Sequence, residues 1–288
     1  MIEFFGKLGE HLGFPVNASE HGLIIDHVNG WIHWFMLILF IGWGFFFILT
    51  LYKFGFKNNN EKADYEGVKN HYSTYAEYGV ILFEVFLLIA FAMPVWSMVK
   101  TDVPDVDNET IEIRVIAQQF AWNIHYPGAD GKFGTTRMDL VDEENPVGLD
   151  RSSVNGADDI VKLNQLHIPV NKDIMIYLSS KDVIHSFSLP EMRIKQDAIP
   201  GMTFPVFFKA KLTTNDFLEK IKGSDRTNPE KYPPASVTGG GYEIACAQLC
   251  GNAHTTMKGY MTVHTMDEFN NWLIEQAEYL PVDDEDDW

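Results

Sequence analysis

The two cysteines of the chain lie close together, in a stretch that also holds a histidine and a methionine. In the sequence CAQLCGNAHTTM, the residues Cys246, Cys250, His254 and Met257 follow one another at spacings of four, four and three. Two thiolates, an imidazole and a thioether form a soft ligand set, which favours copper over calcium or magnesium. One thiolate with imidazole and a weak Met is typical of copper electron-transfer sites. The second thiolate suits two copper ions bridged by both sulfurs.

Three other interpretations of this stretch stay open. A disulfide between Cys246 and Cys250 would form readily outside the cytoplasm, but it leaves His254 and Met257 unexplained. A structural zinc site would need more Cys or His ligands and has little use for Met. The third alternative is that the histidine and the methionine are ordinary surface and core residues.

A further ligand must come from another strand that packs beside this loop. His185, 61 residues before Cys246 in the stretch DVIHSFSLP, is the best of four candidates. The other three, His125, His167 and His264, occur singly in strand-like runs, where a hydrogen-bonded strand histidine is the expected role.

Two long apolar runs near the start of the chain predict a transmembrane hairpin. Residues 31–52 contain no Asp, Glu, Lys or Arg, and residues 78–99 contain a single charge, Glu84. Each run is long enough to cross the hydrocarbon core of a bilayer, and Trp and Tyr lie at the ends. The segment before the first run lacks the basic start of a signal peptide.

The flanking charges predict the orientation of this hairpin. The connector 53–77 holds four lysines, whereas residues 1–30 hold only Lys7. The positive-inside rule therefore places the connector in the cytoplasm and both chain ends outside, with 1–30 as an extracytoplasmic segment.

From Lys100 onward the sequence changes to short β-rich runs separated by turns, which predicts a β-sandwich or small barrel over residues 100–280. The runs expected to form strands are 110–118, 173–180, 203–210, 242–248 and 259–265. Residues from about 128 to 163 are expected to form a surface insertion, with 142–162 its most acidic part, and 281–288 an acidic tail. Residues 267–280 have helical periodicity, with Asp267 as the expected N-cap.

The charge balance restricts the class of partner. The chain has 22 Lys+Arg against 40 Asp+Glu, a formal net charge of −18, which argues against nucleic-acid binding. From Lys100 onward there are 17 Lys+Arg and 31 Asp+Glu. Such an acidic outer domain would steer a basic soluble partner, or the charge serves solubility alone.

The chain resembles subunit II of cytochrome c oxidase, a subunit of the haem–copper terminal oxidases. The resemblance covers the hairpin, the stretch DVIHSFSLPEMRIKQDAIPGM and the stretch CAQLCGNAHTTMKGYM, and therefore the whole architecture. It implies a membrane-anchored all-β protein, in which the two-helix hairpin is followed by a cupredoxin-like sandwich or barrel. The motif Cys-x-Glu/Gln-x-Cys-Gly-x-x-His-x-x-Met is highly specific to that family.

The resemblance implies a mixed-valence dinuclear copper centre, CuA. Cys246 and Cys250 would bridge the two coppers, and His185 and His254 would each bind one of them. Met257 and the backbone carbonyl of Gln248 would be weak ligands, which completes the implied metal set His185, Cys246, Gln248, Cys250, His254 and Met257.

Three features depart from the family pattern. Many relatives carry Glu in place of Gln248 and use it to hold magnesium, so magnesium is left out of the expected cofactors. The aromatic stretch that usually reads Gln-Trp-Tyr-Trp reads Gln-Phe-Ala-Trp here, so Phe120, with Trp122 nearby, stands where electrons would enter. An ordinary strand core remains an equal interpretation of these two residues. A fused haem c domain would need Cys-x-x-Cys-His, which is absent from the sequence.

A carboxylate near the cytoplasmic start of the second span matches one at the mouth of a proton channel in relatives. Glu77 matches by depth, and Glu84, about 10 Å deeper along a helix, is the alternative. A solvated loop charge is an equally good interpretation of Glu77.

The resemblance implies an oxidase subunit that accepts electrons from a c-type cytochrome, either soluble or in a neighbouring complex. It would pass them to haem in the large subunit I, for O2 reduction coupled to proton pumping. The expected location is the inner membrane of a bacterial cell, beside the other oxidase subunits. The alternatives are a quinol oxidase subunit, which usually lacks these ligands, a hairpin-anchored copper carrier, and a nitrogen-oxide reductase, which would need a further His-rich copper cluster.

Overall fold

The computed structural model describes residues 14–56, 66, 69–107, 109–222 and 241–280. The chain forms two compact units: a helical unit that includes Leu23–Asp102, and a β unit that combines Phe14–Gly22 with the chain from Val103 onward. The expected acidic tail 281–288 and most of the connector 53–77 lie outside the described residues.

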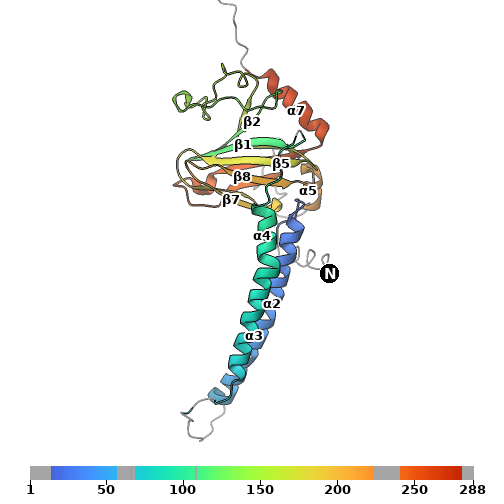
Figure 1. The fold of residues 1–288 in the computed structure, drawn as a ribbon, viewed down its shortest axis with the longest axis vertical. Coiled ribbons are helices and arrows are strands. Elements are labelled where there is room, and N and C mark those ends of the chain that lie inside the picture. The colour runs from blue at the N-terminus through green and yellow to red at the C-terminus, as the bar shows by residue number, and fades with distance from the viewer. Residues whose placement is uncertain (1–13, 57–65, 67–68, 108, 223–240, 281–288) are drawn as a thin grey trace, which may run out of the picture. The chain divides into compact units, whose positions relative to one another are not determined.

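Two long helices make up the helical unit (Figure 1). α2 spans Gly22–Thr50 and continues in π-helical turns over Leu51–Phe56. The second helix consists of α3 (Tyr72–Leu87), a π-helical stretch (Leu88–Ala92) and α4 (Met93–Lys100). This wider stretch ends just before Pro94, which has no N–H to donate, so the irregular turn accommodates the proline without ending the helix.

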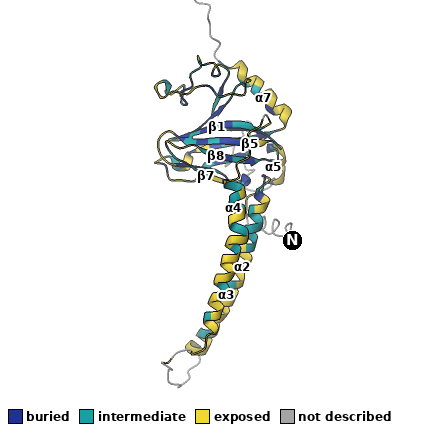
Figure 2. Cartoon of the chain, in the orientation of Figure 1, coloured by how far each residue is buried: buried dark blue, intermediate teal, exposed yellow. Residues whose placement is uncertain are grey.

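The side chains of these helices are mostly exposed in the chain alone (Figure 2). The apolar helical stretches Gly22–Gly55 and Tyr72–Lys100 have 34 and 29 residues, and none of their most apolar window is buried. A helix of about 20 residues already crosses the hydrocarbon core of a bilayer. Both helices are therefore long and apolar enough to span a membrane.

Both helices are longer than the apolar runs that predicted them. The first begins at Gly22 rather than Trp31, and the second begins at Tyr72 rather than Tyr78. The absence of charge marks the part of a helix that suits lipid, whereas the helix itself continues through residues such as Asp26 and Glu77 because nothing in these flanks breaks it.

The β unit contains two five-stranded sheets. Their strand orders are β3-β2-β1-β5-β8 and β4-β10-β9-β6-β7. The strands of the first sheet are β1 (Ile111–Gln118), β2 (Ala121–Tyr126), β3 (Ile160–Leu163), β5 (Asp173–Ser180) and β8 (Phe204–Lys209). Those of the second are β4 (Gln165–Pro169), β6 (His185–Leu189), β7 (Ile194–Ala198), β9 (Tyr242–Cys246) and β10 (Lys258–His264). Short 3-10 turns cover Met138–Leu140, Pro190–Met192 and His254–Thr256.

A single hydrophobic core lies between these sheets. β1 alternates buried and partly exposed residues, with Ile113, Val115 and Ala117 inside, as expected for a strand with one face on a core. Trp122 from β2 and Phe187 from β6 meet edge-to-face, with ring centroids 5.4 Å apart. The predicted all-β sandwich is confirmed, and it has the two-sheet architecture of a cupredoxin-like domain.

Each of the five runs expected to form strands matches one to within two residues at either end: β1, β5, β8, β9 or β10. The other five strands are short, and β2 is buried along its whole length. In β2, apolar Trp122, Ile124 and Tyr126 alternate with polar Asn123 and His125, but the run has only six residues and its polar residues are buried as well. A run this short is a weak signal for a strand.

Among the described residues, two helices cover the β unit, α5 (Thr214–Lys220) and α7 (Met266–Glu278). The expected N-cap of the second, Asp267, is wrong. Thr265 caps α7, because its hydroxyl accepts from the backbone N–H of Glu268 while the Glu268 carboxylate accepts from the N–H of Thr265. This capping box satisfies two N–H groups that Asp267 would leave partly unpaired.

The expected insertion, about 128–163, corresponds to the connection from β2 to β3, but its last four residues form β3 itself. It is fixed to the sandwich by Asp159, whose carboxylate is fully buried. One oxygen of Asp159 lies 2.5 Å from His125 Nε2 and accepts from the N–H of Gly134 at 2.8 Å, and the other accepts from Gly128 at 3.1 Å.

Candidate metal centre

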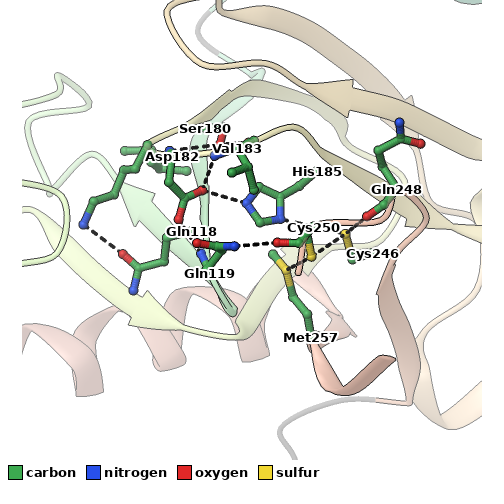
Figure 3. A network of polar contacts seen from close by, with 12 residues as sticks. Gln118, Gln119, Ser180, Asp182, Val183, His185, Cys246, Gln248, Cys250 and Met257 are labelled. Atoms are coloured by element: carbon green, nitrogen blue, oxygen red, sulfur yellow. Dashed lines mark hydrogen bonds and ion pairs between the residues drawn. The ribbon is translucent and has the colours of Figure 1, made fainter. Parts of the chain in front are cut away.

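Strand pairing brings the upstream histidine to the first cysteine. β6 and β9 are antiparallel neighbours, with Phe187 opposite Cys246, and the N–H of Ala247 donates to Ser186 O at 2.9 Å. His185, at the start of β6, therefore reaches the end of β9. Its Nδ1 lies 3.9 Å from Cys246 Sγ (Figure 3).

The loop between β9 and β10 brings the second cysteine back to the same point. The two Sγ atoms are 3.8 Å apart, and both cysteines are free. The metal-binding atoms of His185, Cys246 and Cys250 all lie within 4.8 Å of one another. The disulfide interpretation does not describe this geometry, because bonded sulfurs would be about 2 Å apart.

The remaining atoms of the expected ligand set lie against the same two sulfurs. His254 Nδ1 is 3.5 Å and Met257 Sδ 3.8 Å from Cys250 Sγ. The backbone carbonyl of Gln248 is 3.2 Å from Cys246 Sγ, whereas the Gln248 residue itself is exposed. The structure thus brings all six expected ligands together.

This set of donors fits a soft metal. Two sulfurs 3.8 Å apart can share an ion, since their separation is less than two metal–sulfur bonds of about 2.3 Å each. Thiolate and imidazole donors with a thioether favour copper among the common metals. Among the described residues, His185, Cys246 and Cys250 form the one group of His, Cys, Asp or Glu side chains close enough together to hold a metal.

The electrostatics of the metal-free site disfavour free thiolates. Burial raises the pKa of Cys250 to about 11, and the neighbouring Cys246 adds to the increase. A metal ion must therefore displace a proton from this thiol on binding, so occupancy and deprotonation are coupled.

Sequence reasoning missed two residues beside the centre, Asp182 and Gln119. Asp182 Oδ1 lies 2.8 Å from His185 Nε2, and the backbone N–H of Gln119 donates to Asp182 Oδ2 at 2.7 Å. Burial tends to raise the pKa of Asp182, but the hydrogen bonds from His185, Gln119 and Val183 lower it below its usual value. The sequence does hold one indication for Asp182, because it lies only three residues before the candidate ligand His185. The side chain of Gln119 donates to the backbone carbonyl of Cys250, 131 residues further along the chain, and no local pattern in the sequence indicates this contact.

The two aromatic residues near the start of β2 occupy different environments. Trp122 is fully buried, with its ring centroid 6.3 Å from that of His185. Phe120 is partly exposed and lies against the connection from β9 to β10, residues 247–257, which we call the metal loop. A Cβ on Gly251 of this loop would come within 3.0 Å of the Phe120 ring. Phe120 therefore lies between the surface and the loop that carries Cys250.

The other strand histidines have partners away from the centre. His125 is paired with Asp159, and His167 Nδ1 forms a 2.8 Å hydrogen bond with His264 Nε2. In the helical unit, Glu77 lies in the second turn of α3 and Glu84 further along the same helix, and both are exposed in the chain alone.

Comparison with known proteins finds similarity between this chain and subunits of respiratory oxidases. Residues 111–215 match the family model for the cytochrome c oxidase subunit II periplasmic domain. The chain is 29% identical over 266 residues to an alternative cytochrome c oxidase subunit 2 of Bradyrhizobium diazoefficiens, covering 91% of this chain and 83% of the relative.

Two further matches are more partial. Cytochrome c oxidase subunit 2 of Thermostichus vulcanus is 30% identical over 171 residues, 59% of this chain and 35% of that protein. The crystal structure of the periplasmic domain of subunit II of cytochrome oxidase of Bradyrhizobium japonicum is 26% identical, with a TM-score of 0.38. It covers 62% of this chain and 99% of that one.

Proposed function

We propose that this chain is a subunit II of a cytochrome c oxidase and that it accepts electrons for that oxidase. The proposal is supported by the similarity of residues 111–215 to the family model and by the relative that is 29% identical over 266 residues. In this role it takes single electrons from a c-type cytochrome and passes them to haem in the large subunit, where O2 is reduced to water with proton pumping. The observation that carries the proposal is the convergence of His185, Cys246 and Cys250 within 4.8 Å.

The residues proposed to hold the metal divide into strong and weak ligands. Cys246 and Cys250 would be shared by two copper ions, while His185 and His254 would each hold one. Met257 Sδ and the carbonyl of Gln248 are the weak ligands, one beside each sulfur. A bound dinuclear centre supplies one-electron redox chemistry, and the chain's part is to hold rigid ligands that move little when the charge changes.

A spectrum of the copper-loaded full chain tests this proposal. We expect a purple species with one unpaired electron shared by two equivalent coppers, seen by absorption and electron spin resonance, and lost in Cys246→Ser. Thr255→Ala, an exposed change in the same loop, is the matched control and keeps the spectrum. A mononuclear species, or no bound copper, would reject the relay and favour a copper carrier.

The electron donor is proposed to dock near Phe120. Its ring is partly exposed and adjoins Gly251, while the buried Trp122 packs beside His185. A basic cytochrome fits the acidic domain, so its rate of reducing the full chain is expected to fall steeply with ionic strength. Phe120→Ala should slow this step and leave the copper spectrum unchanged. A flat salt profile and an unchanged rate would reject this docking site.

The helical unit is proposed to anchor the chain in the inner membrane of a bacterial cell, against subunit I and other oxidase subunits. Its two exposed apolar helices support this role. Both chain ends and the β unit then lie on the periplasmic side, with the connector 53–77 in the cytoplasm. Protease access to intact spheroplasts would test this orientation, since cleavage in the connector from outside contradicts it.

Glu77 is proposed to stand at the entrance of a proton channel of the large subunit. It lies near the start of α3, next to the cytoplasmic connector in this orientation. Glu77→Gln should slow turnover of the assembled oxidase without changing the copper spectrum, and Glu66→Gln, outside the helix, is the control. Normal turnover in Glu77→Gln would leave Glu84 as the candidate.

A further inference from the structure

The two histidines of the metal centre have unlike surroundings. His185 is fully buried and has Asp182 on its Nε2 side, at 2.8 Å, with Cys246 on its Nδ1 side. His254 is partly exposed. Among the described residues, no carboxylate forms an ion pair with its ring, and its Nδ1 contacts Cys250 Sγ at 3.5 Å. The ligand set is therefore symmetric in its chemistry but not in its environment.

The carboxylate of Asp182 is held in one orientation. Its Oδ1 accepts from the backbone N–H of Val183 at 2.6 Å as well as facing His185, and its Oδ2 accepts from the backbone N–H of Gln119 at 2.7 Å. The Asp182 side chain is only 31% exposed. Two backbone N–H groups thus orient the carboxylate against one of the two imidazoles (Figure 3).

Gln119 also holds the other side of the centre. Its side-chain Nε2 donates to the backbone carbonyl of Cys250 at 2.6 Å. The next residue of the loop, Gly251, has φ of +134°, and a Cβ there would lie 2.8 Å from Gln119 Nε2. Glycine is required here both by its backbone angle and by this close approach. One residue therefore connects the carboxylate behind His185 with the loop that carries Cys250.

We propose that Asp182, held by Gln119, is a positioning residue that makes the two histidine ligands inequivalent. A neutral imidazole has one donor and one acceptor nitrogen, so a carboxylate at Nε2 fixes the Nε2–H tautomer and leaves the Nδ1 lone pair facing Cys246. A carboxylate hydrogen-bonded to a ligand histidine also raises its basicity as a ligand. His185 is then the stronger donor, and positive charge is favoured on its side of the centre.

Only the unequal share of charge between the two histidines rests on the proposed copper function. The tautomer of His185 belongs to the metal-free protein and can be tested whether or not a dinuclear centre forms. The unequal share of charge needs the loaded centre. The two halves are therefore tested separately, with Asp182→Ala removing both acceptor and charge, and Asp182→Asn keeping an acceptor oxygen without charge.

The first measurement is the nitrogen NMR spectrum of histidine-labelled, metal-free full chain in detergent. We expect His185 as the Nε2–H tautomer in the wild type and in Asp182→Asn, and a tautomer mixture in Asp182→Ala, while the His254 signals stay unchanged. An Nδ1–H tautomer in the wild type, or an unaltered tautomer in Asp182→Ala, would overturn the positioning role.

The second measurement compares the copper-loaded proteins. Copper affinity should fall by about 10- to 100-fold in Asp182→Ala. In Asp182→Asn the nitrogen couplings of the two histidines, measured by electron–nuclear double resonance, should become more equal, and the reduction potential should rise because a negative charge is lost. Asp173→Asn, the same change at the opposite end of β5, is the control.

Each outcome of the second measurement has one meaning. Couplings and potential that match the wild type in Asp182→Asn would overturn the charge effect. A wild type without a dinuclear signal would reject the proposed function instead, and the tautomer result would still decide the role of Asp182.

Discussion

The metal loop and the insertion both connect strands of the same sandwich, yet their polar atoms are used in opposite ways. The insertion is rich in carboxylates that accept from its own backbone: Asp142 Oδ1 from Asn145 at 2.6 Å, and Asp130 Oδ1 from Lys132 at 2.7 Å. In the metal loop, the sulfur and nitrogen donors contact chiefly one another, as in the 3.5 Å approach of His254 Nδ1 to Cys250 Sγ.

This difference shows which donors are available for chemistry. A carboxylate that already accepts two or three backbone N–H groups contributes to the loop's structure and has little capacity left for an ion. Thiols and imidazoles that face one another gain little from these contacts and are free to bind a soft metal. Proximity of ligand-type residues is therefore less informative than what those residues already bind.

The largest expected effect comes from removing the charge that fixes the insertion. Asp159→Asn leaves His125 and the buried N–H of Gly134 without their carboxylate partner. Breaking one side of a buried pair of this kind costs about 3–5 kcal/mol. Denaturant unfolding of the full chain, followed by tryptophan fluorescence, measures the loss.

The control for this change is Asp158→Asn, where the neighbouring carboxylate is only partly buried and accepts from Asp130 N at 3.3 Å. It should cost less than about 1 kcal/mol. The copper spectrum should be unchanged in both variants. A spectrum altered by Asp159→Asn would break the comparison, because the insertion would then take part in the metal centre.

A smaller effect is expected from the histidine pair that lies away from the metal. His167 bonds to His264 and stacks on Trp272, with ring centroids 4.2 Å apart. Burial and the neighbouring His264 lower the pKa of His167 from its ordinary value near 6.5 to about 3. The unfolded chain therefore binds a proton at this residue between these two pH values, whereas the folded chain does not.

The sign of the pH dependence follows from this difference. The contribution of His167 to stability is fully present above pH 6.5 and is lost as the pH falls toward about 3. Between these two pH values, the free energy of unfolding should change by about 1.4 kcal/mol per pH unit because of this one group. Unfolding curves of wild type and His167→Phe between pH 4 and pH 7 measure it, and equal slopes in the two proteins would refute this account.

The smallest expected effect is at Gln248. Its side chain belongs to an exposed residue, and its contact with the centre is the backbone carbonyl, 3.2 Å from Cys246 Sγ. Gln248→Ala should therefore leave both stability and the copper spectrum unchanged. A changed spectrum would mean that the side chain, and not only the carbonyl, acts on the metal.

The sequence predicted the parts of the molecule that depend on local pattern. Two apolar runs, of which only the second contains a charge, predicted the two helices, although the helices start earlier than expected, at Gly22 and Tyr72. Alternating runs predicted β1 and β10, whereas the alternation in β2 is confined to six residues and was not recognised as a strand. The N-cap of α7 was misplaced because two residues that can cap, Thr265 and Asp267, lie two positions apart, and their relative hydrogen bonding decides between them.

The candidate site divides in the same way. The spacing of Cys246, Cys250, His254 and Met257 keeps them close together, since Cys246 ends β9 and the other three lie in the connection from β9 to β10. Only the pairing of β6 with β9 brings His185 to that loop, 61 residues along the chain. Among four candidate histidines, the sequence alone could not select it, and the resemblance to a family did.

The sequence by itself determined the soft donor set, the apolar helices and the acidic β-rich domain, because these depend on residue type and local spacing. Tertiary structure decided that Asp182 and Gln119 lie behind the metal ligands, through bonds of 2.8 and 2.6 Å to His185 and to the carbonyl of Cys250. Such contacts join residues from different strands and loops. They exist only because the register of the sheets places those backbones side by side, which no local pattern encodes.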